Sequence, residues 1–181
     1  VLRVLGALGG KNALAAVRAS LKDGKGEVRD AALRALASWK TPDAAPELLA
    51  TARTTGDPTE KVLCLRGFLR LCSHNDLSVD QRVSMAAEAE PLIAGVQEKR
   101  MLMSVLQRTA SARAMSLAAR YLDDPEVKEE ASVAATTIAE SVVEQDPSAV
   151  RPIMEKVLKT TEHEQVGERA RGVLEKARKI L

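Results

Sequence analysis

Apolar residues recur at helical spacing along the whole chain and are separated by short polar stops. Residues 23–37, D-G-K-G-E-V-R-D-A-A-L-R-A-L-A, show this pattern most clearly, with a turn followed by a stripe of Val28, Ala31, Ala32, Ala35 and Leu36. Spacings of three and four residues predict a helix with one buried face. A stripe of such small side chains cannot form a core alone, so we expect further helices to stack on both sides of it.

Variants of this stretch return along the chain and predict a repeat. Val28 and Val166 stand four copies apart, a mean period of about 34 residues that suits a unit of two helices. We therefore expect a single domain of repeats, in which residues 1–9 are the trailing helix of a preceding repeat. The predicted repeats span residues 10–40, 41–76, 77–109, 110–145 and 146–181.

The composition supports an all-α fold. The chain has one Trp, one Tyr and one Phe among 181 residues, so its core must consist of Leu, Ala, Val and Met, which suit closely packed helices. The alternation of aromatic and β-branched residues that predicts strands is missing. No apolar run approaches the roughly 18 residues of a membrane span. Because Val1 reads as the middle of a helix, we expect a fragment of a larger protein, whose targeting signals cannot be read here.

Four polar residues that precede a proline are predicted to cap helices. Such pairs favour a helix start because the proline lacks the N–H that would be unsatisfied there. Glu60, three residues after Asp57, and the Ser78 and Gln81 pair are predicted capping boxes, and Pro91 should kink or end a helix. The four predicted caps are Thr41-Pro42, Asp57-Pro58, Asp124-Pro125 and Asp146-Pro147.

Two groups of residues resemble the HEAT-repeat family, in the short bacterial form named after the phycobilisome lyases. They are Asp23, Val28, Arg29 and Ala32, and then Asp124, Val127, Lys128 and Ala131. The resemblance implies a right-handed α-α superhelix (a HEAT-like α-solenoid) of about five helical hairpins, with the second helix of each hairpin on the concave face. The L-G-A-L-G-G-K-N-A-L start is also similar to HEAT stretches attached to carbohydrate-active domains in large exported bacterial proteins, which favours export.

The charges are unevenly distributed, and four cations recur with the repeat. Residues 1–40 hold eight Lys or Arg against three Asp or Glu, whereas residues 121–181 hold nine against thirteen. Four cations near the starts of second helices predict a basic ladder, which Gly167 interrupts in the last repeat. The ladder is either a partner-binding face or a set of bonds to the turns between repeats through Asp23, Asp57 and Asp124, and we prefer the second interpretation. The candidate face comprises Arg29, Lys61, Lys99 and Lys128, with Arg66 and Arg70.

Two aromatic residues end predicted helices. Trp39 and Tyr121 would either cover the joint between repeats or present a contact for a partner. Cover is the preferred interpretation for Trp39.

The residues with catalytic or metal-binding chemistry do not form a recognisable site. Cys64 and Cys72 lie eight residues apart on one predicted helix, about 12 Å along its axis, which is too far for a disulfide and indicates core thiols. His74 with Asp76 falls short of the three protein ligands of a catalytic zinc. His163-Glu164 begins like the H-E-x-x-H motif, but Gly167 replaces its second histidine. We therefore predict no catalytic residue, cofactor or metal.

Three functions remain at this point. The first and preferred one is a non-catalytic scaffold that binds a protein partner, or flanking domains of its own chain, through the concave helix face. The second is a nucleic-acid-binding array of the DNA-glycosylase-like kind, which would use the basic N-terminal half on phosphates but normally needs a more basic domain and stacking aromatics. The third is a bilin lyase, which would require a thiol at Cys64 or Cys72.

Overall fold

The structure, a computed structural model, describes residues 2, 6 and 9–181, and every regular element within them is a helix. The all-α prediction is therefore confirmed. The helix predicted for residues 1–9 lies mostly outside the described residues. The chain divides into two compact units, and we describe each by itself: unit 1 is Val1–Leu77 with Ala89–Ile93, and unit 2 is Ser78–Glu88 with Ala94–Leu181.

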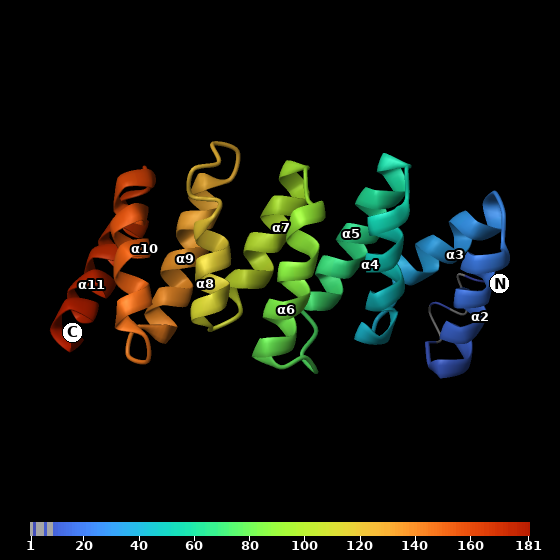
Figure 1. Ribbon diagram of the computed structural model, residues 1–181, viewed down its shortest axis with the longest axis horizontal. Coiled ribbons are helices and arrows are strands. Elements are labelled where there is room, and N and C mark those ends of the chain that lie inside the picture. Colours follow the sequence, from blue (N-terminus) through green and yellow to red (C-terminus); the bar gives the residue numbers. More distant parts are fainter. Residues whose placement is uncertain (1, 3–5, 7–8) are drawn as a thin grey trace. The chain divides into compact units, whose positions relative to one another are not determined.

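Unit 1 contains two packed helical hairpins. Helices α2 and α3 form the first, helices α4 and α5 form the second, and α3 packs against α5 (Figure 1). Short 3₁₀ turns, η1 and η2, precede α4 and follow the helix α6. The bounds are α2 Lys11–Asp23, α3 Glu27–Ala37, η1 Pro42–Ala44, α4 Ala45–Thr54, α5 Pro58–Cys72 and η2 Glu90–Leu92.

The core of unit 1 is built around its single tryptophan. Trp39 is 0% exposed and Phe68 is 2% exposed. Gly67 lets α5 approach α3 closely, because a Cβ atom there would lie 2.8 Å from the Cα atom of Ala37. The predicted stripe is wrong at its first residue, since Val28 is 52% exposed at the start of α3. The later residues of the stripe, Ala32, Ala35 and Leu36, are buried as predicted.

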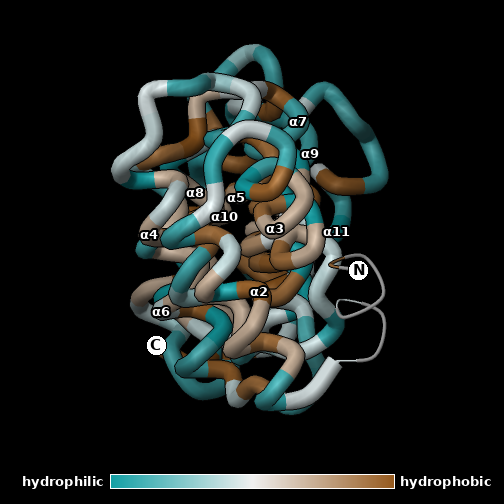
Figure 2. The backbone as a smooth tube through the Cα atoms, turned by 90° about the vertical axis from the view of Figure 1, so that its right-hand side faces the viewer, coloured by the Kyte–Doolittle hydropathy of each residue, from teal (hydrophilic) through white to brown (hydrophobic). Residues whose placement is uncertain are grey.

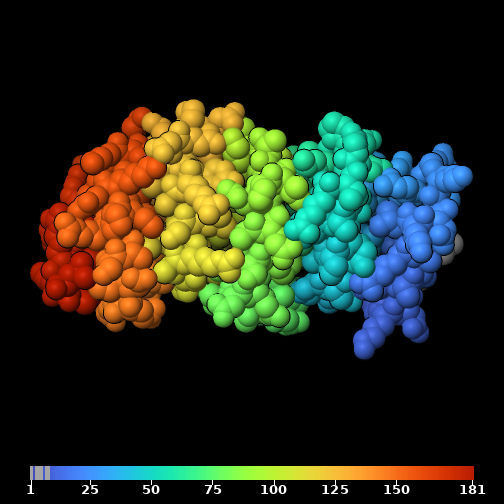
Figure 3. Space-filling model, in the orientation of Figure 1, coloured from blue at the N-terminus to red at the C-terminus, as the bar shows by residue number. Residues whose placement is uncertain are grey.

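Unit 2 repeats the hairpin arrangement. Helices α8 and α9 pack as one hairpin and α10 and α11 as another, while α9 also packs against α7 and α11. In the space-filling view, the side chains of the last two hairpins, yellow to red, are in contact on the face shown (Figure 3). The bounds are α6 Val79–Ala89, α7 Val96–Gln107, α8 Ala112–Ala119, α9 Lys128–Val142, α10 Pro147–Thr160 and α11 Glu164–Ile180.

Small side chains allow the helices of unit 2 to pack closely. Ala131, Ala134, Ala135 and Ala139 on α9 are all completely buried. Larger residues such as Met154 fill the spaces between neighbouring helices, as expected of a flexible thioether side chain. Short hydrophobic and hydrophilic stretches alternate along the backbone, which reflects this one-sided burial (Figure 2).

Several predicted helix starts are confirmed. The side chain of Asp57 accepts hydrogen bonds from two backbone amides of α5, and Asp146 caps α10 in the same way. Ser78 and Gln81 form the reciprocal bonds of a capping box, with distances of 2.8 and 3.2 Å. The helix before Pro91 ends at Ala89, as predicted. These signals are local in sequence, which is why they could be recognised without the tertiary structure.

Three other helix starts agree with the predictions only in part. Asp124 caps a turn, where it accepts from the amide of Glu126 at 3.0 Å, and α9 begins only at Lys128. Thr41 and Pro42 occupy the predicted positions at the start of η1, but the hydroxyl of Thr41 makes no capping bond; it accepts from the indole Nε1 of Trp39 at 3.1 Å and donates to Asp43 at 2.5 Å. Glu60 is the predicted acidic residue in the first turn of α5, but its carboxylate is bound by Arg29 and Thr55 and does not complete a capping box.

Among the described residues, none of the helices combines the length and the apolar character needed to cross a bilayer.

Candidate interaction surface

The predicted ladder cations occupy the starts of second helices. We call the exposed surface of α3 and α5 the second-helix face of unit 1, and the exposed surface of α7, α9 and α11 the second-helix face of unit 2. Arg29, Lys61, Lys99 and Lys128 lie at the N-terminal ends of α3, α5, α7 and α9, and each is half-buried. Their partners therefore decide whether they are available to another molecule.

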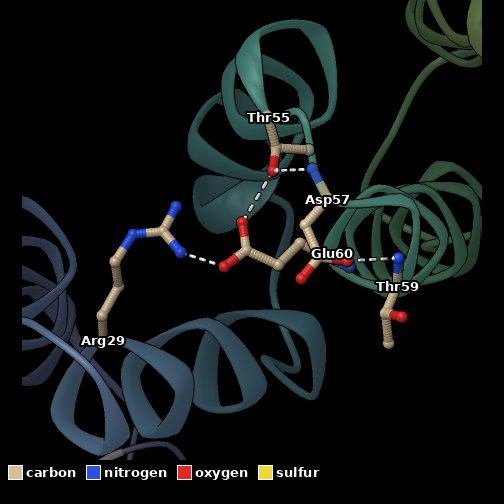
Figure 4. Close-up of polar contacts among 5 residues, drawn as sticks. All are labelled: Arg29, Thr55, Asp57, Thr59 and Glu60. Carbon is tan, nitrogen blue, oxygen red and sulfur yellow. Dashed lines mark hydrogen bonds and ion pairs between the residues drawn. The ribbon is translucent and has the colours of Figure 1, made fainter.

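Arg29 on α3 is bound by the next hairpin of unit 1. Its guanidinium forms an ion pair with Glu60 on α5, and the second carboxylate oxygen of Glu60 accepts from Thr55 Oγ1 at 2.8 Å (Figure 4). Thr55 Oγ1 in turn accepts from the backbone N–H of Asp57 at 3.1 Å. The hydrogen bonds from Arg29 and then from Thr55 hold the pKa of Glu60 below its ordinary value. The cation is thus neutralised within a fixed network that joins two hairpins.

Unit 2 contains the same kind of forward ion pair. The ammonium group of Lys99 lies 2.7 Å from Asp124 and 3.0 Å from Glu126, in the turn before α9. Hydrogen bonding to these carboxylates raises the pKa of Lys99, and the bond from Lys99 lowers the pKa of Asp124. Lys128 pairs with Glu162, in the turn before α11.

Three ladder cations therefore hold successive repeats together, as the structural interpretation of the ladder predicted. The acceptors differ from those expected. Glu60 replaces Asp23 and Asp57 as the partner of Arg29, and only Asp124 is used as predicted. The fourth cation, Lys61, makes no ion pair in the described part of the chain.

The other predicted residues of the face have different environments. Arg70 donates to the carbonyl of Ala37 at 3.1 Å and to that of Trp39, so it satisfies the C-terminal end of α3, and burial lowers its pKa. Arg66 is exposed on α5. The ring of Trp39 is completely buried, which agrees with the preferred interpretation that it covers a joint and not with the alternative of a partner contact. Tyr121 is half-buried in the turn after α8.

The second-helix face of unit 2 contains three hollows in series, which the sequence analysis missed. The largest, about 560 Å³, lies between α7 and the start of α9 and reaches His163. A second hollow of about 390 Å³ shares Val133 and His163 with it. A third hollow of about 270 Å³ between α9 and α11 shares Arg169 with the second.

The hollows follow one position of the repeat. The residues that lie five positions after each ladder position form what we call the fifth-residue column. In unit 1 the column consists of exposed arginines on α3 and α5. In unit 2 it consists of smaller residues, and each of these smaller residues lines a hollow. The small size of the column residues in unit 2 is the sequence signal from which the hollows could have been predicted. The column comprises Arg34, Arg66, Ser104, Val133 and Gly172.

The cations that line the hollows are paired with carboxylates. Nε of Arg100 lies 2.7 Å from Glu130, and Arg169 binds Glu140 through two nitrogens at 2.7 and 2.8 Å. Glu164, at the start of α11, lines the second hollow and makes no ion pair within the described residues. Most charged groups of the lining are therefore already bonded within unit 2.

The predicted absence of reactive groups can be compared with the geometry. Both cysteines are buried and no disulfide joins them, and burial raises the pKa of Cys64 to about 12, which keeps this thiol protonated at neutral pH. Nδ1 of His74 lies 3.6 Å from Asp76 at the surface. Within residues 2, 6 and 9–181, no group of three or more His, Cys, Asp or Glu side chains is arranged to hold a metal ion.

An all-helical array whose hairpins are joined by polar bonds has the architecture of a helical repeat scaffold or interaction module. The family model of HEAT repeats matches residues 1–63. This match supports the predicted HEAT-repeat resemblance over the matched residues, and the helical hairpins that follow are compatible with it. The comparisons with curated proteins and with solved structures give no match.

Proposed function

We propose that this chain is a non-catalytic scaffold module that binds a protein partner, or flanking domains of its own chain, through its second-helix face. The observation that supports the proposal most directly is the series of three hollows along α7, α9 and α11. Repeat arrays offer such extended surfaces without needing reactive groups.

Within this face, the ladder and the column have different roles. Arg29, Lys99 and Lys128 hold adjacent repeats together through carboxylates. Removing them would disturb the array itself, so they are poor reporters of partner binding. We assign the partner contact to exposed residues such as Arg34 on α3 and Gln107 on α7.

Site-specific photo-crosslinking tests this assignment. Benzoylphenylalanine is placed at Arg34 or Gln107 on the second-helix face, and at Ala50 or Ser116 on first helices, all of which are exposed positions. Each purified variant is irradiated in lysate of the source cells, and the crosslinked proteins are identified by mass spectrometry. We expect a shared protein to be crosslinked from the second-helix positions and not from the first-helix positions.

The same experiment separates the alternatives. Crosslinks found only from Ala50 and Ser116 would show that the proposed face is wrong. Treating half of each lysate with nuclease before irradiation tests the nucleic-acid alternative. Crosslinks that disappear after this treatment would favour it over a protein-binding scaffold.

A further inference from the structure

The turn that follows α5 places the imidazole of His74 against a backbone amide. The N–H of Asp76 donates a hydrogen bond to Nδ1 of His74 at 3.3 Å, so this nitrogen presents its lone pair to the proton of the amide. Between the two residues lies Asn75, which is exposed. An asparagine therefore stands directly before an amide whose proton is already shared with a base.

The carboxylate of Asp76 lies beside the same ring nitrogen. One of its oxygens is 3.6 Å from Nδ1 of His74. When Nδ1 accepts the amide proton, the imidazole becomes a cation, and an opposite charge at this distance stabilises it. The gain is moderate, because the side chain of Asp76 is 80% exposed and solvent screens the pair. Asp76 thus supplies both the amide that gives up a proton and a charge that favours the transfer.

We infer that Asn75 is a site of spontaneous deamidation, with His74 as the general base. A general base needs to lie within hydrogen-bond reach of the proton that it removes. His74 meets this condition at the amide that follows Asn75. The inference concerns a chemical modification of the turn, goes beyond the proposed function and does not depend on it.

The reaction uses these three residues and one water molecule. The nitrogen of Asp76 attacks Cγ of Asn75 while Nδ1 of His74 takes up the amide proton. The side-chain nitrogen of Asn75 then leaves as ammonia with the proton that His74 returns, and a five-membered cyclic imide remains. Water opens the imide at one of its two carbonyls, which gives aspartate or isoaspartate. One water is consumed, one ammonia is released, and nothing is oxidised or reduced.

The modified residue lies close to the end of a helix. α5 ends at Cys72, and Ser73 is its C-cap. A new carboxylate at position 75 approaches the negative end of the helix dipole, where negative charge is unfavourable. Isoaspartate also adds a methylene group to the backbone of the turn, in which the amide of His74 donates to the carbonyl of Leu71 at 3.0 Å. Deamidation therefore weakens the C-terminal end of α5.

Incubation of the whole 181-residue chain in neutral buffer tests the inference. Trypsin releases Asn75 in the peptide 71–82 and Asn12 in the peptide 12–18, and mass spectrometry measures the conversion of each asparagine with time. His74→Gln keeps a polar side chain but removes the base, and we expect it to slow the conversion of Asn75 by about tenfold. This factor is below the range of enzymatic bases, because 3.3 Å is long for such a contact.

Two controls separate the base from other effects. Asn12 is the second asparagine of the chain and is exposed on α2, with no histidine beside it in the sequence, so His74→Gln should leave its rate unchanged. Each protein is also compared with a synthetic peptide of its own residues 71–82, in which the fold does not position residue 74. The ratio of the two rates removes the intrinsic effect of the sequence change.

A second variant keeps the test decisive if His74→Gln disturbs the fold, which circular dichroism verifies. Asp76→Ser retains the amide and His74 but removes the carboxylate beside Nδ1. We expect its ratio of folded rate to peptide rate to fall, though less than the ratio for His74→Gln, because the base itself remains.

Three results would overturn the inference. An unchanged or higher ratio in His74→Gln would mean that Asn75 reacts merely as an exposed residue. Equal slowing at Asn12 would show a general effect, and a stable Asn75 in the original chain, over a period in which its free peptide converts, would show that the fold protects it. None of these results concerns the second-helix face, so the proposed function can stand if the inference fails.

Discussion

The two units use the same two-helix repeat but differ in how they complete its exposed face. In unit 1 the hairpins approach closely at Gly67, and the column holds the exposed side chains of Arg34 and Arg66. In unit 2 the corresponding residues are small and line hollows beside the second helices. The same position of the repeat thus carries long charged side chains in one unit and short side chains in the other.

The ion pairs between hairpins also differ between the units. In unit 1 the side chain of Glu60 is 17% exposed and is bound by both Arg29 and Thr55. In unit 2 Glu162, the partner of Lys128, is 79% exposed. A shielded carboxylate with two partners stabilises its charged form more than one in solvent does. The Arg29–Glu60 pair should therefore contribute more to stability than the Lys128–Glu162 pair.

The largest effect should come from adding a methyl group at a buried glycine of unit 1 and at an exposed glycine of unit 2. Gly67→Ala places a Cβ atom 2.8 Å from Ala37, and we expect a net loss of about 1–2 kcal/mol, because overpacking outweighs the gain in helix propensity. Gly172→Ala on α11 meets nothing within 4 Å, and its helix propensity should add about 0.5–1 kcal/mol. Urea unfolding followed by circular dichroism measures both free energies of unfolding.

The fluorescence of Trp39 provides the control for the two glycine substitutions, because Trp39 is the single tryptophan of the chain and reports on the unfolding of unit 1, in which it lies. Its unfolding transition should move to lower urea concentration in Gly67→Ala. A stabilising effect of Gly67→Ala would contradict the close approach of α3 and α5.

The next effect concerns the ion pair of Arg29. Replacing Glu60 by glutamine should cost about 1–1.5 kcal/mol at neutral pH, at the lower end for a hydrogen bond to a charged group because Arg29 is partly exposed. The pKa of Glu60 is lowered from 4.5 in the folded state. The stabilisation that ionised Glu60 provides is therefore present above about pH 4.5. It is lost as the pH falls through the pKa of Glu60 in the folded state.

The difference in unfolding free energy between the original chain and Glu60→Gln should thus be largest at neutral pH and shrink on acidification. Urea unfolding at a series of pH values measures it. Glu162→Gln is the matched change in unit 2, where the exposed carboxylate should give a smaller loss. A pH-independent difference for Glu60→Gln would rule out the charged hydrogen bond as its cause.

The smallest effect is expected at two equivalent helix starts. Asp57 caps α5 through two backbone amides, whereas His163 occupies the corresponding position of α11 without a side-chain cap. Asp57→Ala should lower the melting temperature through a loss of about 1 kcal/mol, a typical value for a lost cap. His163→Ala should leave the melting temperature nearly unchanged. Equal losses from the two substitutions, measured by thermal unfolding, would show that His163 stabilises α11 in some other way.

Much of the fold could be predicted because its signals lie within a few residues of one another. The spacing of apolar residues predicted the helices, and Asp57, Ser78 and Asp146 were recognised as caps. The predictions failed where a distant residue competed for the same group. The carboxylate of Glu60 is bound by Arg29, 31 residues away, and the carboxylate of Asp124 is bound by Lys99, 25 residues away.

The sequence by itself determined that this chain is an array of helices with HEAT-like repeats, because helix periodicity, caps and repeat length are local properties. Only the tertiary structure decided which cations are neutralised and where the second-helix face is open. The partners of Arg29, Lys99 and Lys128 lie 25 to 34 residues further along the chain. Such pairs form only after hairpins stack, and the stacking also leaves the spaces beside Ser104 and Val133.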